Sequence, residues 1–523
     1  MSSPRLPRLV PVVLAVALLA SYAYFYQAGG WNQNSRFALI DAITETGSLQ
    51  IDPFHHHTGD LAVWQGHYYS DKAPGDALAA VPAVWATGLA LRAAGVDPGS
   101  YRGETTRSYV ATVVTAGLGI LLAAGAIWWL GLEWGAGDGG AIFAALAFGL
   151  ATPAWCYATL MFGHSLAAGG LAVALAAAVA LRRADTPRAQ IRCALLVGLA
   201  AGWATVTEFP AAVPAAVLAL LALWEAWPRG GAARRRVFVA VTAGALACAA
   251  VLLAYNRAAF GSAFHIGYES EQRFPGMQEG FFGITTPDHY ALNQILFGQY
   301  RGLLPIAPIL ALAPVLMGWL WYRRPEARKA LVAGALIVVY YVLLNASYQY
   351  WDGGWAFGPR HLVPALPFLC LGFALAWRDG GRFGRALLAA LFLYGAAVSL
   401  VAVSTTPQPP ADYRKPLTQL LLPAFLHGEL GINHQSFLVS AEPAPLLDRS
   451  VKYWAWNVGQ LAGLPGLASL LPLLFVWIGA GGLSWWAVLR APRDRQENAG
   501  RRWMRALAGP RGTMGPLKGN VRT

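Results

Sequence analysis

The sequence has few charged residues and few cysteines, and both absences limit what the protein can be. Of its 523 residues, 12% are charged and 56% are hydrophobic, whereas a soluble domain has about 25% charged residues. An ordinary soluble protein is therefore excluded, and a polytopic membrane protein is predicted. The cysteines lie in apolar runs without metal-type spacing, which argues against a disulfide framework or a zinc site. They are Cys156, Cys193, Cys248 and Cys370.

The sequence also lacks the motifs of nucleotide-driven transporters and of common hydrolases. It contains no P-loop and no HExxH motif, and neither GxGxxG nor GxSxG occurs in a suitable context. The net charge of +13 does not indicate nucleic acid, because Lys and Arg form short clusters between apolar runs and in the tail. Cytoplasmic loops of membrane proteins have this pattern. We expect membrane lipids, and no nucleic acid, among its partners.

Hydrophobic runs predict about twelve transmembrane helices. The first run, 9–27, ends in aromatic residues instead of a cleavage site, so we interpret it as an uncleaved anchor. We place the run 77–94 in the outer interface, because four basic loops then all fall on the cytoplasmic side. These loops are 182–192, 228–236, 322–329 and 378–385. We expect a multi-pass protein of a bacterial cytoplasmic membrane, with both termini in the cytoplasm.

This all-α topology divides the chain into six parts. The first loop is the only long polar region in the first half of the chain, and ionisable groups at the mouth of a membrane bundle are costly unless they bind something. We therefore expect this loop to carry interfacial helices and to form the floor of an extracytoplasmic active site. The parts are the anchor 1–28, the first loop 29–107, the transmembrane core 108–403, an extracytoplasmic segment 404–465, a last transmembrane helix 466–490 and a basic, disordered cytoplasmic tail 491–523.

Candidate catalytic groups lie in the first loop. Asp71 and Lys72 follow two tyrosines; Lys72 could hold a phosphate, and Asp71 could bind a divalent metal or orient a hydroxyl. A self-neutralising turn is the alternative. Asp60 follows three histidines and could act as a general base, while Asp41 lies in a helical pattern and could pair with Arg36. We interpret the three histidines as a solvated loop rather than a metal site.

Later segments supply further candidates on the same face. Arg301 and Arg360 lie at the outer ends of predicted spans, where guanidinium groups could clamp a phosphate or reach toward lipid headgroups. Glu208, near the end of a span, suggests a substrate cavity or a pair with an Arg or His from another span. Trp351 and Trp355 could stack on a sugar or belong to an interfacial aromatic belt.

The order of three short segments resembles a known family. The segments are NQNSRFAL at 32–39, TETGSL at 44–49 and YYSDKAPG at 68–75. Together they resemble the first external loop of the GT-C membrane glycosyltransferases, in the branch that contains the protein O-mannosyltransferases and the lipid A aminoarabinose transferase. The segments 299–305 and 351–361 are similar to bacterial members. The resemblance implies a polyprenyl-phosphate-linked sugar donor and a catalytic carboxylate in this loop.

The chain departs from the family pattern at two places. Asn32 and Gln33 stand where the family has an Asp-Glu pair, and an amide cannot accept a proton from an attacking hydroxyl. His164 stands where many members have an acidic residue. We therefore expect Asp60 or Asp71 to be the base and His164 to orient a hydroxyl, with Asp71 and His164 as possible ligands of a divalent metal. Further substrate and phosphate contacts are expected from Lys72, Arg301, Arg360, Asn32, Arg36, Glu208, Tyr69, Trp351 and Trp355.

These features predict an inverting transfer of a sugar from a polyprenyl-phosphate-linked donor to a lipid, glycan or protein acceptor outside the membrane. The alternative is a non-catalytic lipid or glycan transporter, or a binding scaffold, that keeps the GT-C shell without the acidic pair. The hydropathy pattern gives no sign of the inverted repeats that many transporters have.

Overall fold

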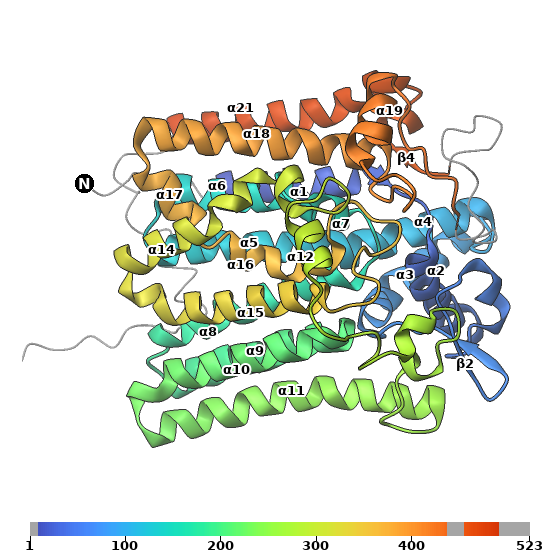
Figure 1. Cartoon of the computed structure of the whole chain (residues 1–523), viewed down its shortest axis with the longest axis horizontal. Helices are drawn as coiled ribbons and strands as arrows, with labels where there is room; N and C mark the ends of the chain where they lie inside the picture. Colours follow the sequence, from blue (N-terminus) through green and yellow to red (C-terminus); the bar gives the residue numbers. More distant parts are fainter. Residues whose placement is uncertain (1–8, 437–453, 491–523) are drawn as a thin grey trace, which may run out of the picture.

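The computed structural model describes residues 9–436 and 454–490, and its long helices lie side by side as a bundle (Figure 1). Among these residues, eight helices are long and apolar enough to cross a membrane. They are Tyr101–Glu133 (α4, η3 and α5), Gly163–Arg183 (α8 and η4), Pro187–Thr207 (α9), Phe209–Arg229 (η5, α10 and η6), Gly231–Phe260 (α11), Pro325–Ala346 (η10 and α15), Gly381–Thr405 (α18) and Gly466–Leu489 (η13 and most of α21). The protein is thus an α-helical multi-pass membrane protein.

A ninth span is possible, but the expected number of about twelve is not confirmed. The ninth would join Arg360–Leu369 (η11 and α16) to Phe373–Asp379 (α17) across a bend of 44°. Three further apolar helices are shorter than the others: α1 (Leu9–Ala23), α6 (Gly137–Leu150) and the run Leu417–Leu426, which joins η12 and α19. The proposed cytoplasmic tail, 491–523, lies outside the described residues.

One predicted span is broken into pieces. The run 303–321 forms α13 (Leu303–Ile306), a 3-10 turn η9 (Pro308–Leu312) and α14 (Ala313–Arg323) instead of one helix. Pro308 has no N–H for a helical hydrogen bond, and its ring disfavours a helical residue before it. Sequence hydropathy does not register such a break, because the run stays apolar throughout.

Small residues set the helix spacing at the centre of the bundle. A Cβ added to Gly169 of α8 would lie 2.4 Å from the carbonyl oxygen of Gly119 in α5, and one added to Gly119 would lie 2.6 Å from Ser165. The backbones of α5 and α8 therefore touch, which only small residues allow.

The first loop folds at one end of the bundle, where Figure 1 places α2, α3 and β2. The hairpin β2–β3 turns through Gln65 and Gly66, both at positive φ (51° and 84°), as a tight hairpin turn requires. The run predicted to be interfacial is α3, a helix that is not among the eight long apolar ones; its place at the outer interface stays a prediction. The elements of the loop are α2 (Trp31–Asp41), η1 (Ala42–Thr46), η2 (Asp52–His57), β2 (Ala62–Trp64), β3 (His67–Tyr69) and α3 (Gly75–Ala93).

Later segments close over this end of the bundle. A short strand pair joins the chain after α1 to the segment before the last helix, and loops after α11 carry two 3-10 turns. These elements are β1 (Phe25–Tyr26), α7 (Ala154–Ala158), η7 (Gly267–Ser270), η8 (Pro275–Gln278), α12 (His289–Leu296), η12 (Leu417–Leu421), α19 (Leu422–Leu426), β4 (Trp456–Asn457) and α20 (Val458–Leu461).

Candidate functional site

One lysine joins two of the predicted catalytic carboxylates. The Nζ atom of Lys72 lies 2.8 Å from Oδ2 of Asp60 and 2.7 Å from Oδ2 of Asp71. The hairpin brings them together, because Asp60 precedes β2 and Lys72 follows β3. Burial lowers the pKa of the Lys72 ammonium, but Asp60 and Asp71 more than reverse this effect, so the net pKa is raised. Lys72 therefore stays charged and is already paired with protein anions.

The two carboxylates differ in their access to solvent. The Asp71 side chain is 2% exposed, and its Oδ1 lies 3.3 Å from the Ser35 hydroxyl, which donates to it. Burial raises the pKa of Asp71, and Lys72 acts against this effect. The Asp60 side chain is 9% exposed, and the Thr58 hydroxyl accepts its backbone N–H at 3.0 Å. Asp60 is thus the more accessible of the two acids.

A second ion pair joins the first loop to the end of α9. Nη2 of Arg36 lies 2.9 Å from Oε1 of Glu208, and Nδ1 of His164 lies 3.5 Å from the same oxygen. Arg36 also donates from Nε to the Oδ1 atom of Asn32 at 3.1 Å and from Nη1 to the carbonyl of Ala73 at 3.3 Å. Glu208 therefore has an arginine and a histidine partner from other segments. This arrangement matches the second interpretation from the sequence, a structural pair, and not an unpaired acid in a substrate cavity.

Gly163 is where this pair is most sensitive to added volume. A Cβ added there would lie 2.4 Å from Oε1 of Glu208 and 2.8 Å from the carbonyl oxygen of Thr207. We expect Gly163→Ala to displace the carboxylate and to lower any activity of the site by about 100-fold, as a displacement of about 1 Å can. Gly125→Ala is the control, because no atom lies within 4 Å of the added Cβ. Equal activity of the two variants would show that the position of Glu208 does not matter.

Among the described residues, the Arg360 guanidinium has no carboxylate as an ion-pair partner. Its guanidinium carbon lies 5.2 Å from the centre of the Phe162 ring, and its Nε is buried without a hydrogen-bond partner. Within residues 9–436 and 454–490, no carboxylate pairs with it. The next residue, His361, places its ring 5.3 Å from the rings of both His164 and Tyr348, and its Nε2 is also buried without a partner. An anion at Arg360 would supply the missing acceptor.

The charged groups act on common neighbours. His164 experiences the charges of Arg360, Arg36 and Lys72. Tyr348 experiences those of Lys72, Arg360 and both aspartates, and burial raises its pKa to about 12. Contacts place these groups in one region: Arg36 bonds to the carbonyl of Ala73, next to Lys72, and His164 contacts both Glu208 and His361. We name this region the polar cluster: Asp60, Asp71, Lys72, Arg36, Glu208, His164, Arg360 and His361.

Other predicted site residues have different surroundings. Arg301 is fully buried and donates to the carbonyl oxygens of Asp352 (2.9 Å), Gly354 (2.6 Å) and Tyr300 (3.2 Å), so its guanidinium holds the loop before Arg360. The Tyr69 ring packs on Phe260 at 5.1 Å. The Trp351 ring lies against Tyr290 and Tyr300, while Trp355 is half-buried.

Two residues of this region escaped prediction from the sequence. His361 follows Arg360 directly in the chain, so the prediction of Arg360 as a site residue could have pointed to His361 as well. Tyr268 lies in the loop after α11, and its hydroxyl experiences the charges of Glu208, Lys72 and Asp71. That loop has no periodic pattern from which a position could be read.

The described residues contain no group of three or more His, Cys, Asp or Glu side chains placed to hold a metal ion. Asp71 and His164, the expected ligands, are engaged with Lys72 and Glu208 respectively. His55, first of the three adjacent histidines, stacks on Tyr68 at 4.1 Å, which fits a structural loop.

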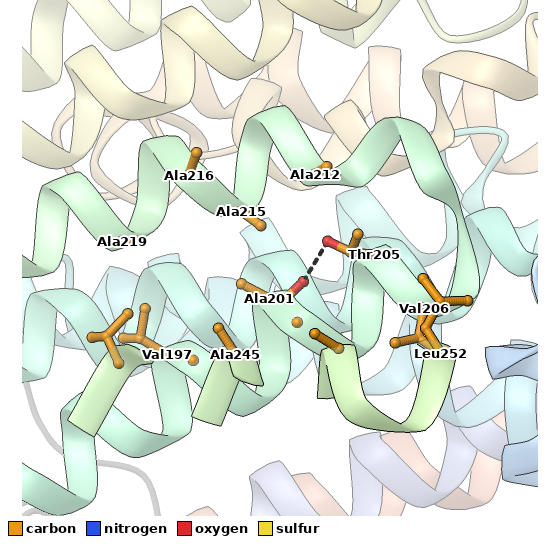
Figure 2. A pocket seen from close by; sticks show the side chains of 14 residues that line it. Val197, Ala201, Thr205, Val206, Ala212, Ala215, Ala216, Ala219, Ala245 and Leu252 are labelled. Atoms are coloured by element: carbon orange, nitrogen blue, oxygen red, sulfur yellow. Dashed lines mark hydrogen bonds between the residues drawn. The ribbon is translucent and has the colours of Figure 1, made fainter. Parts of the chain in front are cut away.

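An apolar cavity lies between α9, α10 and α11 (Figure 2). Its volume is about 270 Å³. The α9 residues that line it include Val197, Thr205 and Val206, and the last of these is two residues before Glu208 in the chain. The Thr205 hydroxyl donates to the carbonyl of Ala201 at 3.1 Å, so it offers no free donor to the cavity. The cavity suits a hydrocarbon chain.

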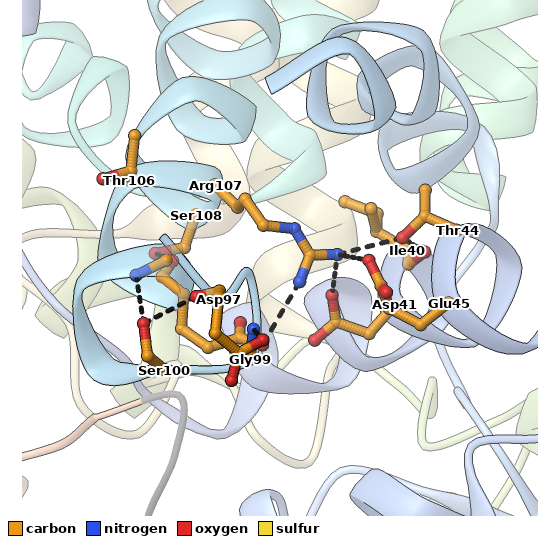
Figure 3. Close-up of polar contacts among 12 residues, drawn as sticks. Ile40, Asp41, Thr44, Glu45, Asp97, Gly99, Ser100, Thr106, Arg107 and Ser108 are labelled. Carbon is orange, nitrogen blue, oxygen red and sulfur yellow. Dashed lines mark hydrogen bonds and ion pairs between the residues drawn. The ribbon is translucent and has the colours of Figure 1, made fainter. Parts of the chain in front are cut away.

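A separate cluster of charges joins α2 to α4 (Figure 3). Nη2 of Arg107 lies 2.6 Å from Asp41 and 3.2 Å from Glu45, and Nη1 lies 3.3 Å from Glu104. Asp41 therefore pairs with Arg107 and not with Arg36. Three carboxylates share one arginine whose side chain is 1% exposed.

Comparison with known proteins gives structural neighbours only. No family model matches the chain, and no curated protein matches it. Among solved structures it is similar to ArnT from Cupriavidus metallidurans in the apo state, with 16% identity, a TM-score of 0.46 and coverage of 80% of this chain and 70% of that chain. It is also similar to the same protein bound to undecaprenyl phosphate, with 18% identity, a TM-score of 0.47 and coverage of 92% and 75%.

Proposed function

We propose that the protein transfers a sugar from a polyprenyl-phosphate-linked donor to an acceptor on the extracytoplasmic side of a bacterial cytoplasmic membrane. The observation that carries the proposal is Arg360, a half-buried arginine whose Nε is buried without a hydrogen-bond partner and whose chain neighbour His361 contacts His164. A phosphate is the ligand that a guanidinium binds best, through paired N–H donors. An apolar cavity near the same end of the bundle is suited to the prenyl chain.

In an inverting transfer, the residues of the polar cluster would have different roles. Arg360 binds the donor phosphate, while Glu208 and His164 orient the acceptor hydroxyl. That hydroxyl oxygen attacks the anomeric carbon, its proton passes to Asp60, and the bond between the anomeric carbon and the phosphate oxygen breaks. The electron pair leaves with the polyprenyl phosphate, so no strong acid is needed. Lys72 holds Asp60 and Asp71 in place through its two ion pairs.

This assignment changes the role expected for Lys72. Two carboxylates at 2.8 and 2.7 Å already occupy its ammonium, so we propose that it positions the base instead of holding phosphate. Arg301, bonded to backbone carbonyls, would position the loop that carries Arg360. Asn32 would act only through Arg36. Tyr69 would support the hairpin, and Trp351 and Trp355 would form the wall beyond Arg360.

The test uses the full chain in lipid nanodiscs with polyprenyl-phosphate-linked sugars. We expect release of polyprenyl phosphate with transfer of the sugar, and we expect Arg360→Gln to reduce the rate by about 100- to 1000-fold, as removal of a donor to a developing charge does. Arg360→Lys should restore part of it. Arg323→Gln is the control and should keep full activity, because Arg323 is an exposed arginine at the end of α14.

Two results would contradict the proposal. Binding of polyprenyl phosphate without turnover of any sugar donor would support the non-catalytic scaffold, in which Asn32 and Gln33 line a passive site. Full activity of Arg360→Gln would mean that another group binds the phosphate.

A further inference from the structure

A second cavity lies in the loops after α11, beyond the polar cluster. Its volume is about 280 Å³. Among the described residues, its lining combines three aromatic rings with amide and carboxylate groups and one thioether, and Glu269 is its only charged side chain. The lining residues are Tyr268, Glu269, Met277, Gln278, Gly280, Phe281 and Phe282. We name this cavity the loop pocket.

The loop pocket borders the polar cluster through Tyr268. This tyrosine lines the pocket, and its hydroxyl experiences the charges of Glu208, Lys72 and Asp71. The contact is close, because a Cβ added to the preceding Gly267 would lie 2.8 Å from the backbone oxygen of Asp71. The loop that forms the pocket therefore packs directly against the segment that carries Asp71.

The backbone is strained where it presents the rings. Phe282 has a φ of 52°, in the left-handed region that bulky residues avoid. Gly280 and Gly283, at φ of 58° and 82°, flank it, and bridges from Ile284 to Phe281 and Tyr348 hold the turn. The adjacent Phe281 ring is 71% exposed, so the strained turn does not serve to bury it.

Exposed rings and polar groups in one concave site fit a saccharide. The C–H face of a sugar ring packs on an aromatic ring, and hydroxyls bond to amide and carboxylate groups such as those of Gln278 and Glu269. Oε1 of Glu269 accepts from the Ile266 N–H at 3.2 Å, and Oε2 lies 3.2 Å from Nδ1 of His265. Each carboxylate oxygen has a second lone pair, which a ligand donor can use. As the only charged group of the lining, Glu269 disfavours anionic sugars and favours neutral or amino sugars.

We propose that the loop pocket binds a neutral or amino saccharide unit of the acceptor and delivers it past Tyr268 to the polar cluster. The inference rests on the proposed transfer function and names the acceptor as a glycan or a glycan-bearing lipid. Phe281 supplies the stacking face, and Gln278 and Glu269 bind hydroxyl or amino groups.

The direct test is binding, measured by saturation-transfer NMR on the full chain in nanodiscs free of glycoside detergents. The probes are cellobiose, a glucosamine disaccharide and digalacturonic acid. We expect the first two to bind better than the third. Phe281→Ala should weaken their binding about five- to tenfold, the range of a lost stacking contact. Phe264→Ala is the matched control, an 82% exposed phenylalanine of the same loop that does not line the pocket, and it should have no effect.

Transfer assays separate this proposal from the function on which it rests. If transfer occurs, Phe281→Ala should raise KM for the acceptor and leave KM for the donor unchanged. Equal behaviour of the Phe281→Ala and Phe264→Ala variants, preference for digalacturonic acid, or no saccharide binding at all would overturn the loop pocket even with an active enzyme. Binding that depends on Phe281 without any turnover would support the pocket and refute the transferase.

Discussion

Asp60→Asn is expected to lower the rate of sugar transfer by about 100- to 10,000-fold, the contribution usual for a positioned general base. The amide keeps the size of the side chain but cannot take the acceptor proton. Asp71 cannot easily replace it, because its side chain is 2% exposed and Ser35 and Lys72 occupy its oxygens. Single-turnover kinetics with a labelled donor would measure the loss in the chemical step, while donor binding should change little.

Asp52→Asn provides the matched control. Asp52 lies in the same loop and accepts from His67 and from the Tyr68 N–H, both at 2.7 Å, but its side chain is 37% exposed and it does not contact Lys72. Its variant should keep nearly full activity. If Asp60→Asn stays active while Asp71→Asn does not, the base is Asp71. Full activity of both would remove the Lys72 pair from the chemistry.

Local features of the site could be predicted from the sequence because short chain segments build them. Asp60, Asp71 and Lys72 are joined by one hairpin whose turn carries a glycine, so their proximity follows from the strand pairing. Their roles could not be read in the same way. The sequence left two roles open for Lys72, a phosphate ligand or a self-neutralising pair with Asp71, and the choice depends on how both carboxylates are oriented.

Ion pairs between residues far apart in the chain could not be predicted, because no periodic pattern in the sequence indicates which residues will meet. Arg36 and Glu208 are 172 residues apart in the chain, yet they form a 2.9 Å ion pair. Asp41 seemed suited to the nearby Arg36 and instead pairs with Arg107, on a helix that follows α3. Likewise, the apolar run 303–321 predicted a span, whereas backbone breaks at its prolines decide its shape.

The cluster around Arg107 should matter for stability more than for chemistry. Burial raises the pKa of Asp41 from its usual 3.8 to about 7, and Arg107 acts against this effect. Between about pH 4 and 7 the folded protein therefore holds a proton that the unfolded chain has released. This carboxyl thus stabilises the fold most at low pH, and its contribution declines as the pH rises through that window.

Arg107→Met is expected to destabilise the protein by about 3–5 kcal/mol at neutral pH, because it leaves buried carboxylates without their cation. The loss should grow as the pH rises through about 7, where Asp41 ionises in the folded protein and needs its cation, and it should be smaller below that pH, where Asp41 is protonated. Arg92→Met is the control: Arg92 pairs with Glu45 at 2.5 Å, but its side chain is 45% exposed, so a loss below about 1 kcal/mol is expected. Unfolding of both variants in nanodiscs, followed across pH, measures the difference. A loss for Arg107→Met that does not depend on pH would mean that Arg107 stabilises the contact between α2 and α4 through packing and not through its charge.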